Sequence, residues 1–171
     1  MTNCLKSSIG DGKRNLRITN QIYSNEIISE KSINSCIFID TRFENCQFES
    51  ITFFSTVFSQ CKFDQCIFSE SNFDDAAIRR CKFNNSKFIK SDLINLEIKQ
   101  VTFDSCQFDQ VSFAKSYIEN SFFSNSDFQD MRTLGLCPII ENSKISIKNS
   151  GSILFDGHFD FDKVLKFLTS A

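Results

Sequence analysis

Glycine, proline, tryptophan and histidine are scarce in this chain of 171 residues, which contains five Gly, one Pro, no Trp and one His. No glycine occurs between Lys13 and Leu134, so the glycine-rich loops that bind nucleotide phosphates are excluded there. The lone His158 excludes most histidine metal sites and nucleophile–base pairs. The net charge of −2 is typical of neither nucleic-acid-binding nor strongly acidic proteins. The composition therefore favours a non-enzymatic binding or structural protein without catalytic residues, cofactor or metal.

Long apolar segments are also missing. No apolar run approaches the roughly 18 residues of a membrane-spanning helix. The first seventeen residues contain no apolar segment of the kind found in signal peptides. We therefore expect a cytoplasmic protein that does not insert into a membrane.

Phenylalanine, in contrast, is abundant and periodic. Every fifth position from Ile33 to Phe128 is Phe, Ile or Leu, without a slip. The residue two positions earlier, from position 36 to position 126, is usually Cys, Ser, Thr or Ala; the exceptions are Ile51, Leu96, Val101 and Val111. A period of five fits neither a helix nor an ordinary strand. It predicts a backbone that turns a corner every five residues and points one large and one small side chain inward.

Four such repeats would close a square coil, and stacked coils would pair through their backbones as a parallel β-helix. Residues 31–130 would then form about five coils of an all-β fold. Residues twenty apart would lie above one another. The predicted column at the centre of the core is Phe43, Phe63, Phe83, Phe103 and Phe123.

The same register assigns most of the cysteines. Six of the eight occupy the small inward position: Cys36, Cys46, Cys61, Cys66, Cys81 and Cys106. Buried free cysteine behaves as a small apolar residue. We therefore interpret these six as reduced core residues. Cys4 and Cys137 lie outside the repeat and are not assigned.

The repeats CQFES, CKFDQ, CIFSE, CKFNN and SKFIK resemble the pentapeptide-repeat family, and the resemblance covers about residues 31–130. It implies a right-handed quadrilateral β-helix. Several members, among them the Qnr-type quinolone-resistance proteins and the microcin immunity proteins, are rods that resemble duplex DNA and bind DNA gyrase. Unlike Qnr-type proteins, this chain has no loops that interrupt the repeats.

The two ends depart from the pattern. Residues 1–30 form either a degraded first coil or an N-terminal cap, because Gln21 and Glu26 are large and polar for inward positions. In the C-terminal segment, 131–171, residues 143–148 alternate as in a strand. Residues 160–169 are typical of an amphipathic helix. Its apolar face, which would either cap the last coil or form a homodimer, consists of Phe161, Val164, Leu165 and Leu168.

Stacking at intervals of twenty residues also predicts the surface. An apolar edge contains Ile37, Phe54, Val57, Ile94 and Tyr117, with Ala77 and Ala114. A basic corner contains Arg42, Lys62, Arg79, Arg80, Lys82 and Lys99. An acidic side, interrupted by Lys87 and Lys90, contains Glu44, Glu49, Asp64, Glu70, Asp92, Asp104, Asp109, Asp127 and Asp130.

These surfaces support two hypotheses. In the first, the rod mimics DNA and protects a type II topoisomerase such as DNA gyrase from inhibitors or toxins, without binding nucleic acid itself. Its partner-binding residues are Glu49, Glu70, Asp92, Asp109, Asp127 and Asp130. In the second, the protein is an interaction scaffold or bacterial effector that docks partners through the apolar edge. The sequence leaves both open.

Overall fold

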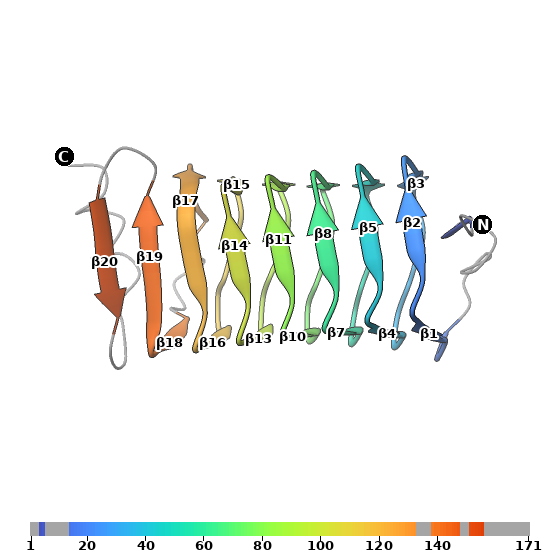
Figure 1. Ribbon diagram of the computed structural model, residues 1–171, viewed down its shortest axis with the longest axis horizontal. Coiled ribbons are helices and arrows are strands. Elements are labelled where there is room, and N and C mark those ends of the chain that lie inside the picture. The colour runs from blue at the N-terminus through green and yellow to red at the C-terminus, as the bar shows by residue number, and fades with distance from the viewer. Residues whose placement is uncertain (1–3, 6–13, 133–137, 148–150, 156–171) are drawn as a thin grey trace.

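The computed structural model describes residues 4–5, 14–132, 138–147 and 151–155. These residues form an all-β parallel solenoid, as the sequence predicts (Figure 1). Paired strands are in parallel register at an offset of twenty residues, so that Phe83 pairs with Phe63 on one side and with Phe103 on the other. The solenoid has about six turns rather than the expected five, because residues 17–29 form a first turn in the same register.

Three walls of the solenoid are built from strands. Wall A contains β1 (Arg17–Thr19), β4 (Ile37–Ile39), β7 (Val57–Ser59), β10 (Ala77–Arg79), β13 (Glu97–Lys99), β16 (Tyr117–Glu119) and β18 (Ile139–Glu141). Wall B contains β2 (Ile22–Ser24), β5 (Arg42–Glu44), β8 (Lys62–Asp64), β11 (Lys82–Asn84), β14 (Thr102–Asp104) and the start of β17 (Phe122–Gln129). Wall C contains β3 (Ile27–Ser29), β6 (Gln47–Glu49), β9 (Ile67–Ser69), β12 (Lys87–Ile89), β15 (Gln107–Asp109) and the end of β17.

The fourth wall, wall D, is made differently. Isolated parallel bridges, rather than strands, connect its turns: Ser32 to Thr52, Thr52 to Asn72, Asn72 to Asp92 and Asp92 to Ser112. A tight turn follows each bridge and leads back to wall A. Backbone hydrogen bonds still connect adjacent turns of wall D, as from the N–H of Phe53 to the carbonyl oxygen of Asn72 at 2.7 Å.

Stacked aromatic rings fill the core. The five phenylalanines of the predicted column lie on wall B, with ring centroids 4.4–4.9 Å apart and nearly parallel planes. Rings of neighbouring walls meet edge to face, as Phe63 and Phe68 do at 5.7 Å. Both arrangements are favourable for aromatic quadrupoles.

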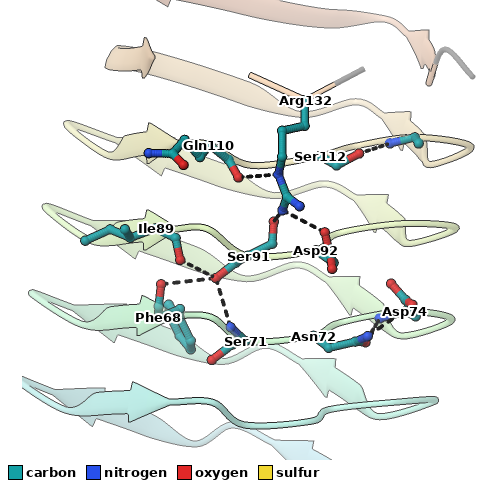
Figure 2. Close-up of polar contacts among 11 residues, drawn as sticks. Phe68, Ser71, Asn72, Asp74, Ile89, Ser91, Asp92, Gln110, Ser112 and Arg132 are labelled. Carbon is teal, nitrogen blue, oxygen red and sulfur yellow. Dashed lines mark hydrogen bonds and ion pairs between the residues drawn. The ribbon is translucent and has the colours of Figure 1, made fainter. Parts of the chain in front are cut away.

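The small inward residues hold the turns together through hydrogen bonds as well as by their size. The Ser91 hydroxyl lies 3.2 Å from the carbonyl oxygen of Phe68, in the turn before, and accepts a hydrogen bond from the N–H of Ser71 at 3.2 Å (Figure 2). A thiol acts in the same way: Cys81 Sγ accepts from the N–H of Cys61 at 3.3 Å and lies 3.5 Å from the carbonyl oxygen of Phe58. Ser, Thr and Cys at this position therefore satisfy backbone groups that bend inward at the corners.

The six cysteines that the repeat places inward are buried and free. Burial raises the pKa of the Cys106 thiol to about 12. A protonated thiol can donate to the carbonyl oxygen of Phe83, which lies 3.4 Å from Cys106 Sγ. Cys4 is exposed, and Cys137 lies outside the described residues.

Each corner requires one residue in the left-handed region. Every fifth residue from Asn15 to Asp130 has a φ between 45° and 60°, and none of them is glycine. Asn and Asp, which tolerate this conformation best among non-glycine residues, occupy many of these positions. Arg80 and Lys90 occupy it with long, unbranched side chains.

The first described turn departs from the repeat at its inward positions. Its inward position on wall C is Glu26, whose Oε1 accepts a hydrogen bond from the N–H of Leu5 at 2.6 Å. Leu5 is fully buried beside the core residues of this turn. Among the described residues no earlier turn stacks on Gln21 and Glu26, so large polar side chains fit at these positions. Residues 15–32 are thus the first turn of the coil.

The C-terminal side extends the same walls. β18 adds a seventh strand to wall A, and β19 (Ser143–Ile147) pairs in parallel with β17 on wall B. β20 (Gly151–Phe155) pairs antiparallel with β19. The strand expected at 143–148 is therefore present as β19. The apolar helical face of Phe161, Val164, Leu165 and Leu168, as well as His158, lies outside the described residues.

Candidate partner-binding surfaces

The charges of wall A are paired with one another. Arg79 makes two hydrogen bonds of 2.9 Å to the carboxylate of Glu97. Lys99 lies 3.5 Å from Glu97 and 3.4 Å from Glu119, so one continuous network crosses three turns. The hydrogen bonds from Arg79 hold the pKa of Glu97 below its ordinary value.

This network includes Tyr117, which the sequence placed on the apolar edge. Its hydroxyl donates to Glu141 at 2.7 Å, and Lys99 Nζ lies 5.2 Å from the centre of its ring. The hydrogen bond to Glu141 raises the pKa of Tyr117 to about 12. Tyr117 therefore belongs to a polar network that connects β18 to the solenoid.

Three of the six cations of the predicted basic corner are paired with carboxylates. Arg79 and Lys99 are paired as described, and Arg42 lies 3.5 Å from Glu44. Of the other three cations, Arg80 donates to Gln100 at 3.0 Å, and Lys62 and Lys82 are exposed. In the described part of the chain none of these three has a carboxylate within 4 Å.

Five carboxylates of the acidic side have no cationic partner among the described residues. Glu49 and Asp109 share one column of wall C, with Ser69 and Ile89 between them, and Glu70 and Asp130 lie at the corner between walls C and D. Asp127 shares a column with Lys87, separated from it by Gln107. Among the described residues no cation lies within 4 Å of these five carboxylates.

Asp92, like Glu44 on the same side, has a cationic partner. Its carboxylate lies 2.7 Å from the guanidinium of Arg132, which also donates to the carbonyl oxygens of Ser91 at 3.1 Å and Gln110 at 2.7 Å (Figure 2). Arg132 thus connects two earlier turns of the solenoid, in the wall that has bridges in place of strands. The structure gives Asp92 a structural contact where the sequence placed it in the partner-binding set.

The apolar edge is interrupted by a carboxylate. Phe54 is 42% exposed, and Ile37, Val57 and Ile94 are half-buried. Asp74 lies between Phe54 and Ile94 in one column of wall D, because the N–H of Ser55 donates to the carbonyl oxygen of Asp74 and that of Asp75 to Ile94. Ala77 and Ala114 are buried.

Asp74 is poorly solvated. Its Oδ2 accepts a hydrogen bond from Asn72 at 3.1 Å, and its Oδ1 is buried without a hydrogen-bond partner. Burial raises the pKa of Asp74 above its ordinary value, and the charges of Asp92 and Asp75 add to the rise. The carboxylate thus lacks a cationic partner within the described part of the molecule.

The rest of the described surface has shallow hollows and no deeply enclosed cavity. A hollow of about 370 Å³ lies across the corner between walls B and C, lined by Asn85, Lys87, Gln107, Asn125 and Asp127 among others. Among the described residues, no three His, Cys, Asp or Glu side chains gather as a metal site would require. No helix within those residues is long and apolar enough to span a membrane.

Sequence reasoning missed Asp74 and Arg132. Both were within reach of the twenty-residue stacking rule, since 54, 74 and 94 form one column and 92, 112 and 132 another. The reach of Arg132 back across two turns, however, depends on its side-chain conformation, which no periodicity specifies.

Two family models match the chain. The pentapeptide repeat region model matches residues 56–132, and the model of the SV2A/B/C luminal domain matches residues 5–88. No curated protein sequence matches significantly.

Solved structures resemble the chain at low identity. A trypsin-treated single-substitution variant of QnrB1, a plasmid-mediated fluoroquinolone resistance protein, is 16% identical with a TM-score of 0.44, over 94% of this chain and 92% of its own. Full-length QnrB1 is 13% identical with a TM-score of 0.42, over 94% and 93%. HetL from the cyanobacterium Nostoc sp. strain PCC 7120 is 7% identical with a TM-score of 0.24, over 81% and 76%.

Proposed function

Because this chain belongs to the pentapeptide-repeat protein family, we propose that it is a non-enzymatic rod that binds a basic protein surface in place of nucleic acid. The partner we propose is a type II topoisomerase, DNA gyrase, which the rod would protect from inhibitors or toxins. The partner class follows from the family resemblance of the repeats. The use of the acidic side follows from the contrast between the walls.

That contrast is the observation that carries the proposal. On wall A, carboxylates and cations neutralise each other within a few ångströms. On wall C and its corner with wall D, the carboxylates of Glu49, Glu70 and Asp109 have no such partners among the described residues. Unpaired surface charge of one sign steers association with a surface of the opposite sign.

The acidic side carries less charge per unit length than duplex DNA, which limits the electrostatic attraction it can provide. Without Asp92 and Glu44, which have cationic partners, seven of the nine acidic-side carboxylates remain, against Lys87 and Lys90. Five net charges over five turns of about 4.8 Å leave about one charge per 5 Å, compared with one per 1.7 Å of duplex DNA. Electrostatic attraction would therefore be collective, sensitive to salt and weaker than that of DNA.

A supercoiling assay tests the proposal. Gyrase is assayed with and without a quinolone at increasing concentrations of the protein, and direct binding is measured at low and physiological salt. We expect protection from the quinolone and binding that weakens as salt rises. Absence of binding at low salt would refute the topoisomerase assignment.

Charge reversal locates the surface. Changing Glu49, Glu70 and Asp109 together to Lys should abolish gyrase binding while leaving the melting temperature nearly unchanged. Glu70→Lys and Asp40→Lys form a matched pair, because both residues are left-handed corner residues on opposite corners. Glu70→Lys should weaken binding more than Asp40→Lys, and equal effects would contradict the use of the acidic side.

A further inference from the structure

Phe54 is an exposed aromatic residue in the same column of wall D as Asp74, which has no cationic partner among the described residues. Phe54 is 42% exposed, whereas the phenylalanines of the repeat core other than Phe128 are almost fully buried. An exposed ring on a rigid turn loses little conformational entropy when a partner covers it. It is thus the kind of residue that supplies an interface with binding energy that charge alone does not provide.

Two carboxylates lie beside this ring. Asp74 follows Phe54 one turn later in the same column, about 4.8 Å along the rod. Asp75 is a corner residue of the same turn, and its side chain accepts a hydrogen bond from Asn95. No cation lies within 4 Å of either carboxylate in the described residues. The nearby basic residues are Arg132, which is committed to Asp92, and Lys115, two turns from Asp75 at the same corner.

Apolar side chains frame these acids on the other side. Ile94 follows Asp74 in the column, and Val57 lies on wall A just beyond the corner. Within about three turns, the surface thus presents a flat ring, two carboxylates and two aliphatic side chains. This combination matches the side chain of arginine. A guanidinium stacks on an aromatic face, pairs with carboxylates and has an aliphatic stem that packs on apolar surface.

We infer that the patch formed by Phe54, Val57, Asp74, Asp75 and Ile94 is the anchor for an arginine side chain of a protein partner. Arginine fits better than lysine because it is planar, less strongly hydrated and able to pair with two acceptors at once. The inference rests on the proposed function in one respect: the arginine would belong to the same basic surface that the acidic side attracts. The apolar edge and the acidic side are then parts of one interface that meets across wall D.

A peptide probe tests the anchor without any topoisomerase. The chain contains no tryptophan, so binding of a ten-residue peptide of alternating arginine and serine with one tryptophan is followed by peptide fluorescence. We expect a peptide with lysine in place of arginine to bind several times more weakly. Phe54→Ala should weaken binding of the arginine peptide about tenfold. Asp75→Asn should weaken it by a smaller factor.

Phe122 supplies the matched control. It is 50% exposed on wall B, away from the patch, so Phe122→Ala removes the same exposed ring from a different wall. Phe122→Ala should bind the arginine peptide like the unmodified protein. Phe54→Leu keeps apolar area and removes the aromatic face, and it should lose most of the preference for arginine over lysine. Equal binding by Phe54→Ala and Phe122→Ala, or equal affinity for the two peptides, would overturn the inference.

The same variants separate this inference from the proposed function. If the arginine peptide binds through Phe54 and gyrase does not bind at all, the anchor stands and the topoisomerase assignment fails. If gyrase binds and Phe54→Ala binds it equally well, the assignment stands and the anchor fails.

Discussion

The first turn and the interior turns follow the same repeat, but they place different kinds of residue at the small inward position. In an interior turn, the small inward residue must fit beneath its neighbours and satisfy backbone groups of the turn before, as Ser91 does for Phe68 and Ser71. In the first turn the same position holds Gln21 and Glu26, and Glu26 binds the backbone of Leu5 instead. The inward position therefore requires a small residue only where a neighbouring turn packs against it. A departure from the repeat therefore marks an end of the stack and does not mean that the coil is absent.

The largest contrast should come from the aromatic column. Phe83→Ala removes a buried ring stacked at 4.4 Å on Phe63 and at 4.9 Å on Phe103, and should destabilise the protein by about 3–5 kcal/mol. Tyr23→Ala, in the first turn, removes a ring stacked on Phe43 at 5.5 Å and should have a smaller effect. Chemical denaturation measures both. An equal loss for the two variants would mean that the end of the stack is packed as tightly as its middle.

The inward hydroxyl should show the next effect. Ser86→Ala removes the acceptor of the Cys66 N–H at 3.2 Å and a contact with the carbonyl oxygen of Phe63, so two buried groups lose a partner. We expect a loss of about 1–3 kcal/mol, measured by chemical denaturation. Gln21→Ala in the first turn should change stability by less than about 0.5 kcal/mol.

Thiol and hydroxyl should be interchangeable at this position. Ser86→Cys is the control for Ser86→Ala, because Cys81 makes the same two kinds of contact. If Ser86→Cys is as destabilising as Ser86→Ala, the residue matters for its size or polarity and not for these hydrogen bonds.

Exchanging a large and a small residue between two stacked turns should have an intermediate effect on stability. Leu96 is buried in the small column directly above Ala76, whose N–H is satisfied by Phe73 at 3.0 Å and so does not depend on residue 96. Ala76→Leu should destabilise by about 1–3 kcal/mol. Combining it with Leu96→Ala should recover part of that loss, with a coupling above about 0.5 kcal/mol. Strictly additive losses in a double-mutant cycle would mean that these two turns do not share volume.

The smallest effect should be the same in both regions. Corners need a left-handed residue in every turn, so Asn20→Lys in the first turn and Asn85→Lys in an interior turn should each lose about 0.5 kcal/mol. Lys90→Asn should gain a similar amount. The melting temperatures of the three variants test this, and a loss confined to Asn85→Lys would show that the first turn has a looser corner.

The fold could be predicted from the sequence alone, because a period of five residues requires a backbone that turns a corner every five residues. The sequence also determined which residues share a column, since each turn takes twenty residues, and it thereby placed the acidic side and Phe54 on the surface. The period places each residue in the solenoid. Because most of the large core residues are phenylalanine, their positions are sufficient to predict how the core is built.

Which charges remain unpaired depends on side-chain conformations in the folded protein. Arg79 and Glu97 pair across adjacent turns, Arg132 reaches back to Asp92, and Asp74 sits half-buried beside Phe54. Long side chains choose among several neighbours according to their conformation, and the repeat does not encode that choice. The walls differ in their available charge for this physical reason: the backbone makes them alike, and side-chain pairing neutralises one of them while leaving another charged.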